Sequence, residues 1–199
     1  MQRTTPELVF AIAQEAMGRG DWEEFFECLD QRDLLRLAPM VFDVPGGASL
    51  CLEYGIPADA LKHIETLIQD INESGRAMLR RHEGIPNSSA IQSDLLEHSA
   101  RHQGLIVAFH KAMEECLKFV PNLASFTAKA ERLKRAASGG GSVSSTLFAG
   151  ESLCDLKVRG WKASGVRRRQ GGSLEPIAFV QKKGLWYIRL FSKTRSRVK

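Results

Sequence analysis

Two side chains in the last quarter of the sequence could form an acid–base pair. Asp155 is one of three acidic residues after residue 150, and Tyr187 is the only tyrosine there. A carboxylate base that faces an acidic donor can remove a proton beside a carbonyl group and stabilise the oxyanion that results. Asp155 and Tyr187 are therefore the catalytic candidates. The alternative is that Asp155 is a surface residue at a strand end and that Tyr187 packs with its hydroxyl group in water.

A second pair of candidates is His98 with His102, because histidines four residues apart lie one turn apart on the same face of a helix. Two such imidazoles can share a metal ion, with a third ligand from His63 or Glu65. Arg101 lies between them and adds positive charge. The alternative is a pair of half-buried histidines held by hydrogen bonds, and we expect neither a metal nor a cofactor.

The charge of the chain is concentrated at its carboxyl-terminal end. Residues 1–150 carry a net charge of −5 and residues 151–199 a net charge of +10. The basic residues include Arg167, Arg169, the pair at 182–183 and a tail at 193–199. Such a cluster can be solvated surface that protects strand edges, a docking site for an acidic protein, or a phosphate-binding surface. Solvated surface is the leading interpretation. The missing stacking motif argues against sequence-specific recognition of a nucleic acid, so an acidic protein ranks ahead of a nucleic acid as a partner.

The elements that would position these residues are helical up to about residue 137. Thr5 followed by Pro6 predicts the start of a first helix, and Asp21 predicts the start of a second. Apolar residues at helical spacing then predict a short helix disturbed by a proline and three longer helices. Their expected ranges are 33–42, 57 to about 80, 93–119 and 122–137.

After the glycine-rich residues 138–142 the apolar period changes from 3.6 to 2, which predicts an antiparallel sheet and an α+β fold. The expected strands are 145–149, 152–159, 162–169, 174–181 and 185–191. Trp186, Ile188 and Leu190 should face a core that the first helices cover. Tyr187, Arg189 and Phe191 should face the other way, as an interface. The predicted core includes Trp22, Phe25, Phe26, Phe179, Trp186 and Ile188.

The segments "TPELVFAIAQEAMGRGDWEEFFECL" and "GESLCDLKVRGWKASGVRRRQGGSLEPIAFVQKKGLWYIRLF" resemble the opening helices and closing strands of the nuclear-transport-factor-2-like (NTF2-like) superfamily, which includes the SnoaL and ketosteroid-isomerase-like proteins. The resemblance implies a curved sheet wrapped around helices as a cone, with dimerisation through the sheet. One NTF2-like domain would cover residues 1–199. Residues 57–137 would be a helical insertion within it.

The sequence has no stretch of apolar residues long enough for a membrane span and no signal peptide, so we expect a cytoplasmic protein without a membrane partner. Four scattered cysteines fit buried free thiols. We expect a non-enzymatic binding or scaffold module. The alternatives are a small-molecule or isomerase-type pocket between the sheet and the helices, and a basic module that binds nucleic acid without sequence preference.

Overall fold

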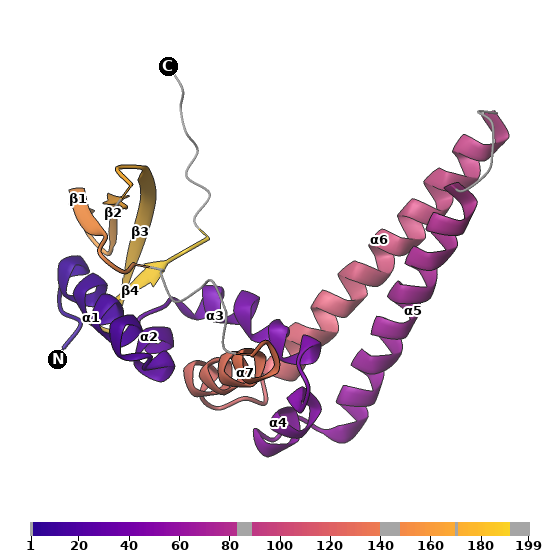
Figure 1. Cartoon of the computed structure of the whole chain (residues 1–199), viewed down its shortest axis with the longest axis horizontal. Helices are drawn as coiled ribbons and strands as arrows, with labels where there is room; N and C mark the ends of the chain where they lie inside the picture. Colours follow the sequence, from indigo (N-terminus) through magenta and orange to yellow (C-terminus); the bar gives the residue numbers. More distant parts are fainter. Residues whose placement is uncertain (1, 83–88, 140–147, 170, 192–199) are drawn as a thin grey trace. The chain divides into compact units, whose positions relative to one another are not determined.

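The structure is a computed structural model that describes residues 2–82, 89–139, 148–169 and 171–191. Over these residues the chain forms seven α-helices, one 3₁₀-helix and a four-stranded antiparallel sheet (Figure 1). This confirms the predicted α+β class. The chain divides into two compact units: the first joins Met1–Leu50 to Asn122–Lys199, and the second is Cys51–Pro121.

The first two helices begin at the residues that the sequence predicts. In front of α1 (Pro6–Arg19), the Thr5 hydroxyl accepts a hydrogen bond from the backbone N–H of Leu8 at 3.3 Å. In front of α2 (Trp22–Glu27), the Asp21 carboxylate accepts one from the backbone N–H of Glu24 at 3.1 Å. Between them Gly20 adopts a left-handed φ of 71°, which ends α1.

The single short helix predicted over 33–42 is divided in two. It consists of α3 (Gln31–Leu37) and the 3₁₀-helix η1 (Ala38–Asp43). The division falls at Pro39, whose nitrogen has no hydrogen to continue an α-helical ladder. A further helix, α4 (Gly47–Glu53), begins where a Cβ atom on Gly47 would overlap the backbone carbonyl of Val41. Glycine is therefore required at that position.

The last helix, α7 (Leu123–Ala137), begins at Asn122, whose side chain accepts a hydrogen bond from the N–H of Ser125 at 3.1 Å. α7 packs against α2 and η1, so it belongs to the first unit. The predicted insertion at 57–137 thus joins parts of two units. The second unit ends at Pro121, and the helix after it contributes to the core of the first.

The sheet contains β1 (Ser152–Arg159), β2 (Lys162–Arg168), β3 (Leu174–Lys182) and β4 (Leu185–Arg189), in that spatial order. Each strand pairs antiparallel with the next. A further strand was predicted over 145–149. Residues 145–147 lie outside the described part of the chain, and residues 148–150 form a turn.

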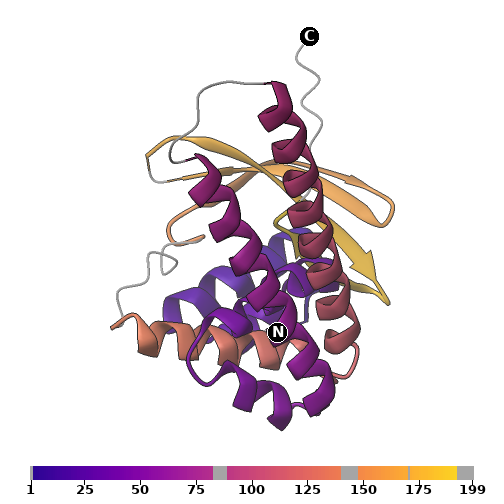
Figure 2. The ribbon, with the colours of Figure 1, turned by 90° about the vertical axis from the view of Figure 1, so that its right-hand side faces the viewer.

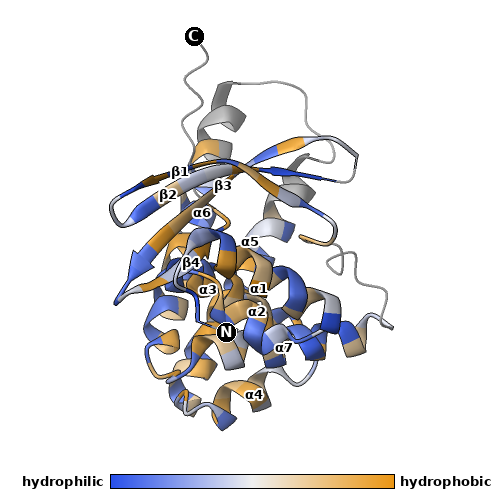
Figure 3. Cartoon of the chain, turned by 90° about the vertical axis from the view of Figure 1, so that its left-hand side faces the viewer, coloured by the Kyte–Doolittle hydropathy of each residue, from blue (hydrophilic) through white to orange (hydrophobic). Residues whose placement is uncertain are grey.

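One face of the sheet covers α1 and α2, and the core lies between them (Figure 3). All six predicted core residues are buried, which confirms that the tryptophan side of β4 faces inward. Phe148 fills the centre of this core, with its ring centroid 5.2 Å from that of Phe10 and 5.9 Å from that of Phe25. The core is therefore built from both ends of the sequence.

The outer edge of β4 is covered by the amino-terminal part of the chain. The N–H of Trp186 donates to the carbonyl of Arg3, and the N–H of Ile188 donates to the carbonyl of Cys28, each at 2.8 Å. The N–H of Asp30 donates in turn to the carbonyl of Ile188 at 2.8 Å. β4 therefore has backbone partners on both sides.

The second unit consists mainly of α5 (Ala58–His82) and α6 (Ser89–Leu117), which run side by side (Figure 2). They are packed through buried side chains at one end of the pair: Leu61, Ile64, Leu67, Met113 and Leu117. Farther along, Ile71 and Leu105 are only half-buried. Among the described helices, none combines the length and the hydropathy needed to cross a lipid bilayer.

Candidate binding surface on the sheet

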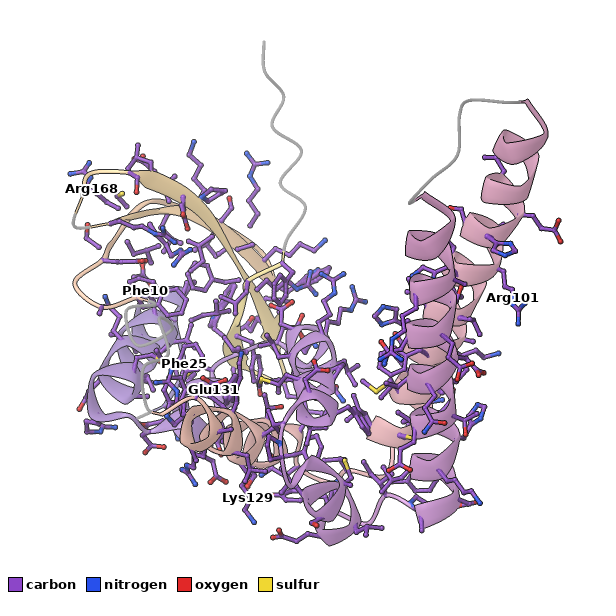
Figure 4. The ribbon with its side chains drawn as sticks, turned by 45° about the vertical axis from the view of Figure 1, so that its right-hand side comes forward. Phe10, Phe25, Arg101, Lys129, Glu131 and Arg168 are labelled. Atoms are coloured by element: carbon purple, nitrogen blue, oxygen red, sulfur yellow. The ribbon has the colours of Figure 1, made fainter. Side chains whose placement is uncertain are left out.

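Buried and exposed side chains alternate along β2. Ala163, Gly165 and Arg167 are buried, whereas Lys162 and Arg168 are exposed. Successive side chains of a strand point to opposite faces, so the exposed set lies on the face away from α1 and α2. We call this the outer face of the sheet and define it by the exposed residues Lys157, Arg159, Lys162 and Arg168 together with the half-buried Tyr187. Figure 4 shows Arg168 at an end of the sheet, apart from Phe10 and Phe25.

Arg167 belongs to the inner face, where its charge is neutralised. Its guanidinium donates to Glu151 at 2.9 Å and to Glu175 at 2.5 Å, and it lies 4.9 Å from the centre of the Phe148 ring. Arg169 adds contacts to the same two carboxylates, at 2.9 Å to Glu175 and 3.5 Å to Glu151. We predicted both arginines on a partner surface. The structure corrects this for Arg167, which is 8% exposed, and shows that both are held in a local ion-pair cluster.

Asp30 neutralises two further cations at the β4 side of the sheet. This buried carboxylate accepts from the Lys182 ammonium group and from Nε of Arg189, the latter at 2.7 Å. Burial by itself would raise the pKa of Asp30, but the hydrogen bonds and charges of the two cations outweigh it and lower the pKa below its usual value. Arg189, which we predicted at an exposed interface, thus forms an ion pair within the chain.

Four exposed basic residues remain on the outer face without an ion pair within the described residues: Lys157, Arg159, Lys162 and Arg168. Arg159 is directly opposite Lys162, and Lys157 is opposite Ser164, so three of these charges gather near the β1–β2 turn. Like charges this close repel one another. Binding an anion there would relieve that repulsion.

Aromatic rings lie beside cations at two places on the outer face. The register aligns Arg159, Lys162, Val180 and Tyr187 in one row that crosses all four strands, but Val180 is only 1% exposed and adds no open surface to the row. At the turn, the Lys162 ammonium lies 4.1 Å from the ring centre of Trp161, which is 55% exposed. At the other end, the Arg3 guanidinium lies 4.9 Å from the ring centre of Tyr187. The surface therefore offers cations beside partly exposed rings.

The structure does not bring the two catalytic candidates together. Asp155 lies on β1 with a left-handed φ of 52°, where the register of β1 shifts between Cys154 and Lys157. Tyr187 lies on β4, at the opposite edge of the sheet. Three strand spacings separate these edges, about 14 Å. Hydrogen-bond reach is near 3 Å, so Asp155 and Tyr187 do not form one acid–base site.

The histidine pair lies in the second unit, on α6. His98 lines a hollow of about 270 Å³ together with Asp70, Glu73 and Arg101. Nδ1 of His102 is buried without a hydrogen-bond partner among the described residues. Across the described ranges, no three or more His, Cys, Asp or Glu side chains gather in a way that could hold a metal ion.

Phe191 is the last residue of the predicted interface. It is 45% exposed, and the Arg36 guanidinium lies 5.7 Å from its ring centre. The basic tail at 193–199 lies outside the described residues. The structural account of the binding surface therefore rests on β1–β4.

Sequence reasoning missed Lys157, Arg159, Lys162 and Arg168. A signal for two of them was present, because Arg167 shares its parity in β2 with Ala163 and Gly165 and falls on the apolar side. Lys162 and Arg168 have the opposite parity and therefore face outward. Lys157 and Arg159 were harder to place, since the register shift in β1 interrupts the alternation.

Comparisons of this chain with protein-family models, with curated proteins and with solved structures found no match in any of the three.

Proposed function

We propose that this protein is a non-enzymatic binding module whose outer sheet face docks an acidic surface of a protein partner. The observation that carries the proposal is the division of the sheet's cations. Arg167, Arg169, Lys182 and Arg189 have carboxylate partners within the chain. The four cations of the outer face have no carboxylate partner among the described residues. They are therefore available to an external anion.

An acidic partner fits this surface better than a second copy of the same face. A twofold axis near the β1–β2 turn would bring Lys157, Arg159 and Lys162 of each copy near one another, which costs free energy. Sheet-to-sheet dimerisation, implied by the NTF2-like resemblance, is disfavoured on this ground. An isomerase-type pocket would need Asp155 and Tyr187 in one cavity, and they lie on opposite edge strands.

An NTF2-like architecture and a cytoplasmic location are part of the proposal. The order of elements supports the first, since two amino-terminal helices pack on a closing antiparallel sheet. The four cysteines support the second, because all are free thiols, as is usual in a reducing compartment.

Charge reversal of the outer face tests the proposal. The full chain and its Lys157→Glu/Arg159→Glu/Lys162→Glu variant would be titrated against a fluorescent poly-glutamate peptide, with anisotropy as the readout at several salt concentrations. We expect the affinity of the variant to fall by about a hundredfold, because each charge-assisted contact contributes about 1 kcal/mol or more. Added salt should weaken binding by the wild type.

A matched control reverses three exposed basic residues elsewhere in the first unit, as Arg32→Glu/Arg132→Glu/Lys134→Glu. It changes the net charge equally and should retain most of the binding. A single-stranded oligonucleotide is the second probe. Binding of neither probe at low salt would refute the proposal. Much tighter binding of the oligonucleotide than of the peptide would replace the protein partner with a nucleic acid.

A further inference from the structure

One exposed side of α6 has an unusual composition for a solvent-facing helix surface. Ala100, Gly104, Val107 and Ala108 are all exposed, and residues at this spacing share one side of a helix. Val107 is 66% exposed, and Leu96, at the edge of the same side, is 72% exposed. We call this the α6 outward face. Arg101 of the same helix, labelled in Figure 4, is not part of this face, because it lines the hollow that His98 shares with Asp70 and Glu73 of α5.

The centre of the α6 outward face permits close approach of another helix. A Cβ atom added to Gly104 would meet no atom within 4 Å. Ala100 and Ala108, one turn before and one turn after it, carry only methyl groups. The distance between the axes of packed helices depends on the side chains at the contact, so small residues here allow a short separation.

Two opposite charges lie symmetrically about this centre. Glu97 is seven residues before Gly104 and Lys111 seven residues after it, and both are exposed on the same side of the helix. Neither has an ion pair within the described residues. In an antiparallel pair of α6 helices related by a twofold axis at Gly104, Glu97 of each copy lies opposite Lys111 of the other.

We propose that the α6 outward face binds a second copy of this chain, with the two α6 helices antiparallel and crossing at Gly104. Two ion pairs form between Glu97 and Lys111 in this arrangement. A parallel arrangement would place Glu97 against Glu97 and Lys111 against Lys111. The charge pattern therefore selects the antiparallel one.

The exposed apolar residues fit the same symmetry. Val107 of one copy and Leu96 of the other lie on the same side of the twofold axis, about 7.5 Å apart along the helices. Their side chains can span this distance, so each covers apolar surface that is exposed in the single chain. One helix from each copy makes a small interface, and we expect a weak, concentration-dependent dimer.

Charge reversal at Glu97 and Lys111 tests the proposed dimer. Sedimentation velocity of the full chain over a range of concentrations would compare the wild type with Glu97→Lys, Lys111→Glu and the double variant that carries both changes. Each single reversal creates two like-charge contacts and should raise the dimer dissociation constant by about tenfold or more. The double variant restores opposite charges at both contacts and should dimerise like the wild type.

Two further variants separate association from folding. Glu65→Lys changes an exposed glutamate on α5 and should leave the dissociation constant unchanged. Gly104→Gln should prevent close approach while retaining the helix, since glutamine is a better helix former than glycine. A wild type that stays monomeric at the highest attainable concentration would overturn the proposal, and so would a double variant that fails to recover. Dimerisation insensitive to all α6 variants would assign the interface to another surface.

Discussion

The two units of this chain bury their apolar side chains to different extents. In the first unit a sheet and several helices enclose residues such as Phe126 and Phe148, each fully buried. In the second unit the helix pair leaves Ile71, Leu105 and Phe109 only half-buried along most of its length. Two helices share a single contact stripe, whereas a helix layer under a sheet is covered from several directions.

The comparison shows that the first unit contains its own core, whereas the helices of the second unit leave part of their apolar side chains accessible to solvent. Helices obtain most of their stability from packing of an apolar face rather than from intrinsic propensity. The half-buried residues of α5 and α6 therefore contribute less per side chain than those under the sheet. Substitutions of one residue type in both units can measure this difference.

The largest expected effect comes from shortening one phenylalanine in each unit. Phe179→Ala in β3 removes a side chain that is 1% exposed, and we expect a loss of about 3–5 kcal/mol in the free energy of unfolding. Phe109→Ala in α6 removes a half-buried side chain and should cost about 1–2 kcal/mol. Urea unfolding followed by circular dichroism measures both values. Equal losses would contradict the difference between the units.

Two glycines give the second test, with effects of opposite sign. Gly47→Ala places a methyl group against the Val41 carbonyl and should destabilise the protein by about 1–3 kcal/mol. Gly104→Ala meets open space on α6 and should stabilise it by about 1 kcal/mol through helix propensity. Thermal unfolding at a concentration low enough to keep the chain monomeric measures both. A stabilising Gly47→Ala would show that the contact with Val41 is looser than described.

The smallest effect concerns the acid stability of the first unit. The pKa of Asp30 is lowered in the folded state from an ordinary value of 3.8. Its ionised form therefore stabilises the fold above about pH 3.8, and this contribution is lost as the pH falls through the lowered folded pKa. The stability difference between the wild type and Asp30→Asn should thus shrink as the solution is acidified.

Asp33 acts in the opposite direction, because burial raises its pKa above 3.8. Its contribution to stability decreases as the pH rises from the unfolded value through the raised folded value. Chemical denaturation at several acidic pH values, with the exposed Asp43→Asn as control, tests Asp30 separately. The difference in the free energy of unfolding between the wild type and Asp30→Asn should therefore change with pH. A constant difference would show that the ion pairs of Asp30 do not cause it.

Local signals made much of the fold predictable. Thr5, Asp21 and Asn122 cap helices through contacts within three residues, so their effect is visible in a short window of sequence. Alternation around Trp186 and Ile188 correctly assigned the buried side of β4. Pro39 correctly marked a disturbance of the third helix, whereas the start of α4 depends on the close contact of Gly47 with Val41, which a periodicity does not encode.

The candidate surface was only partly predictable, because partners far apart in the sequence decide which cations are open. Asp30 neutralises Arg189 across 159 residues, and Glu151 reaches Arg167 from outside the alternating strand pattern. Net charge alone therefore overestimated the basic surface at these positions. It also gave no reason to choose Lys157 over Arg167.

The backbone contact between Leu29 and Ile188 joins positions 159 residues apart. A ribosome adds about 5–20 residues per second, so roughly 10–30 s pass between the synthesis of one partner and the other. During that interval α1 and α2 have no sheet to cover their apolar sides. The nascent chain is then open to aggregation, and molecular chaperones that bind exposed apolar segments would have their strongest effect on it at this stage.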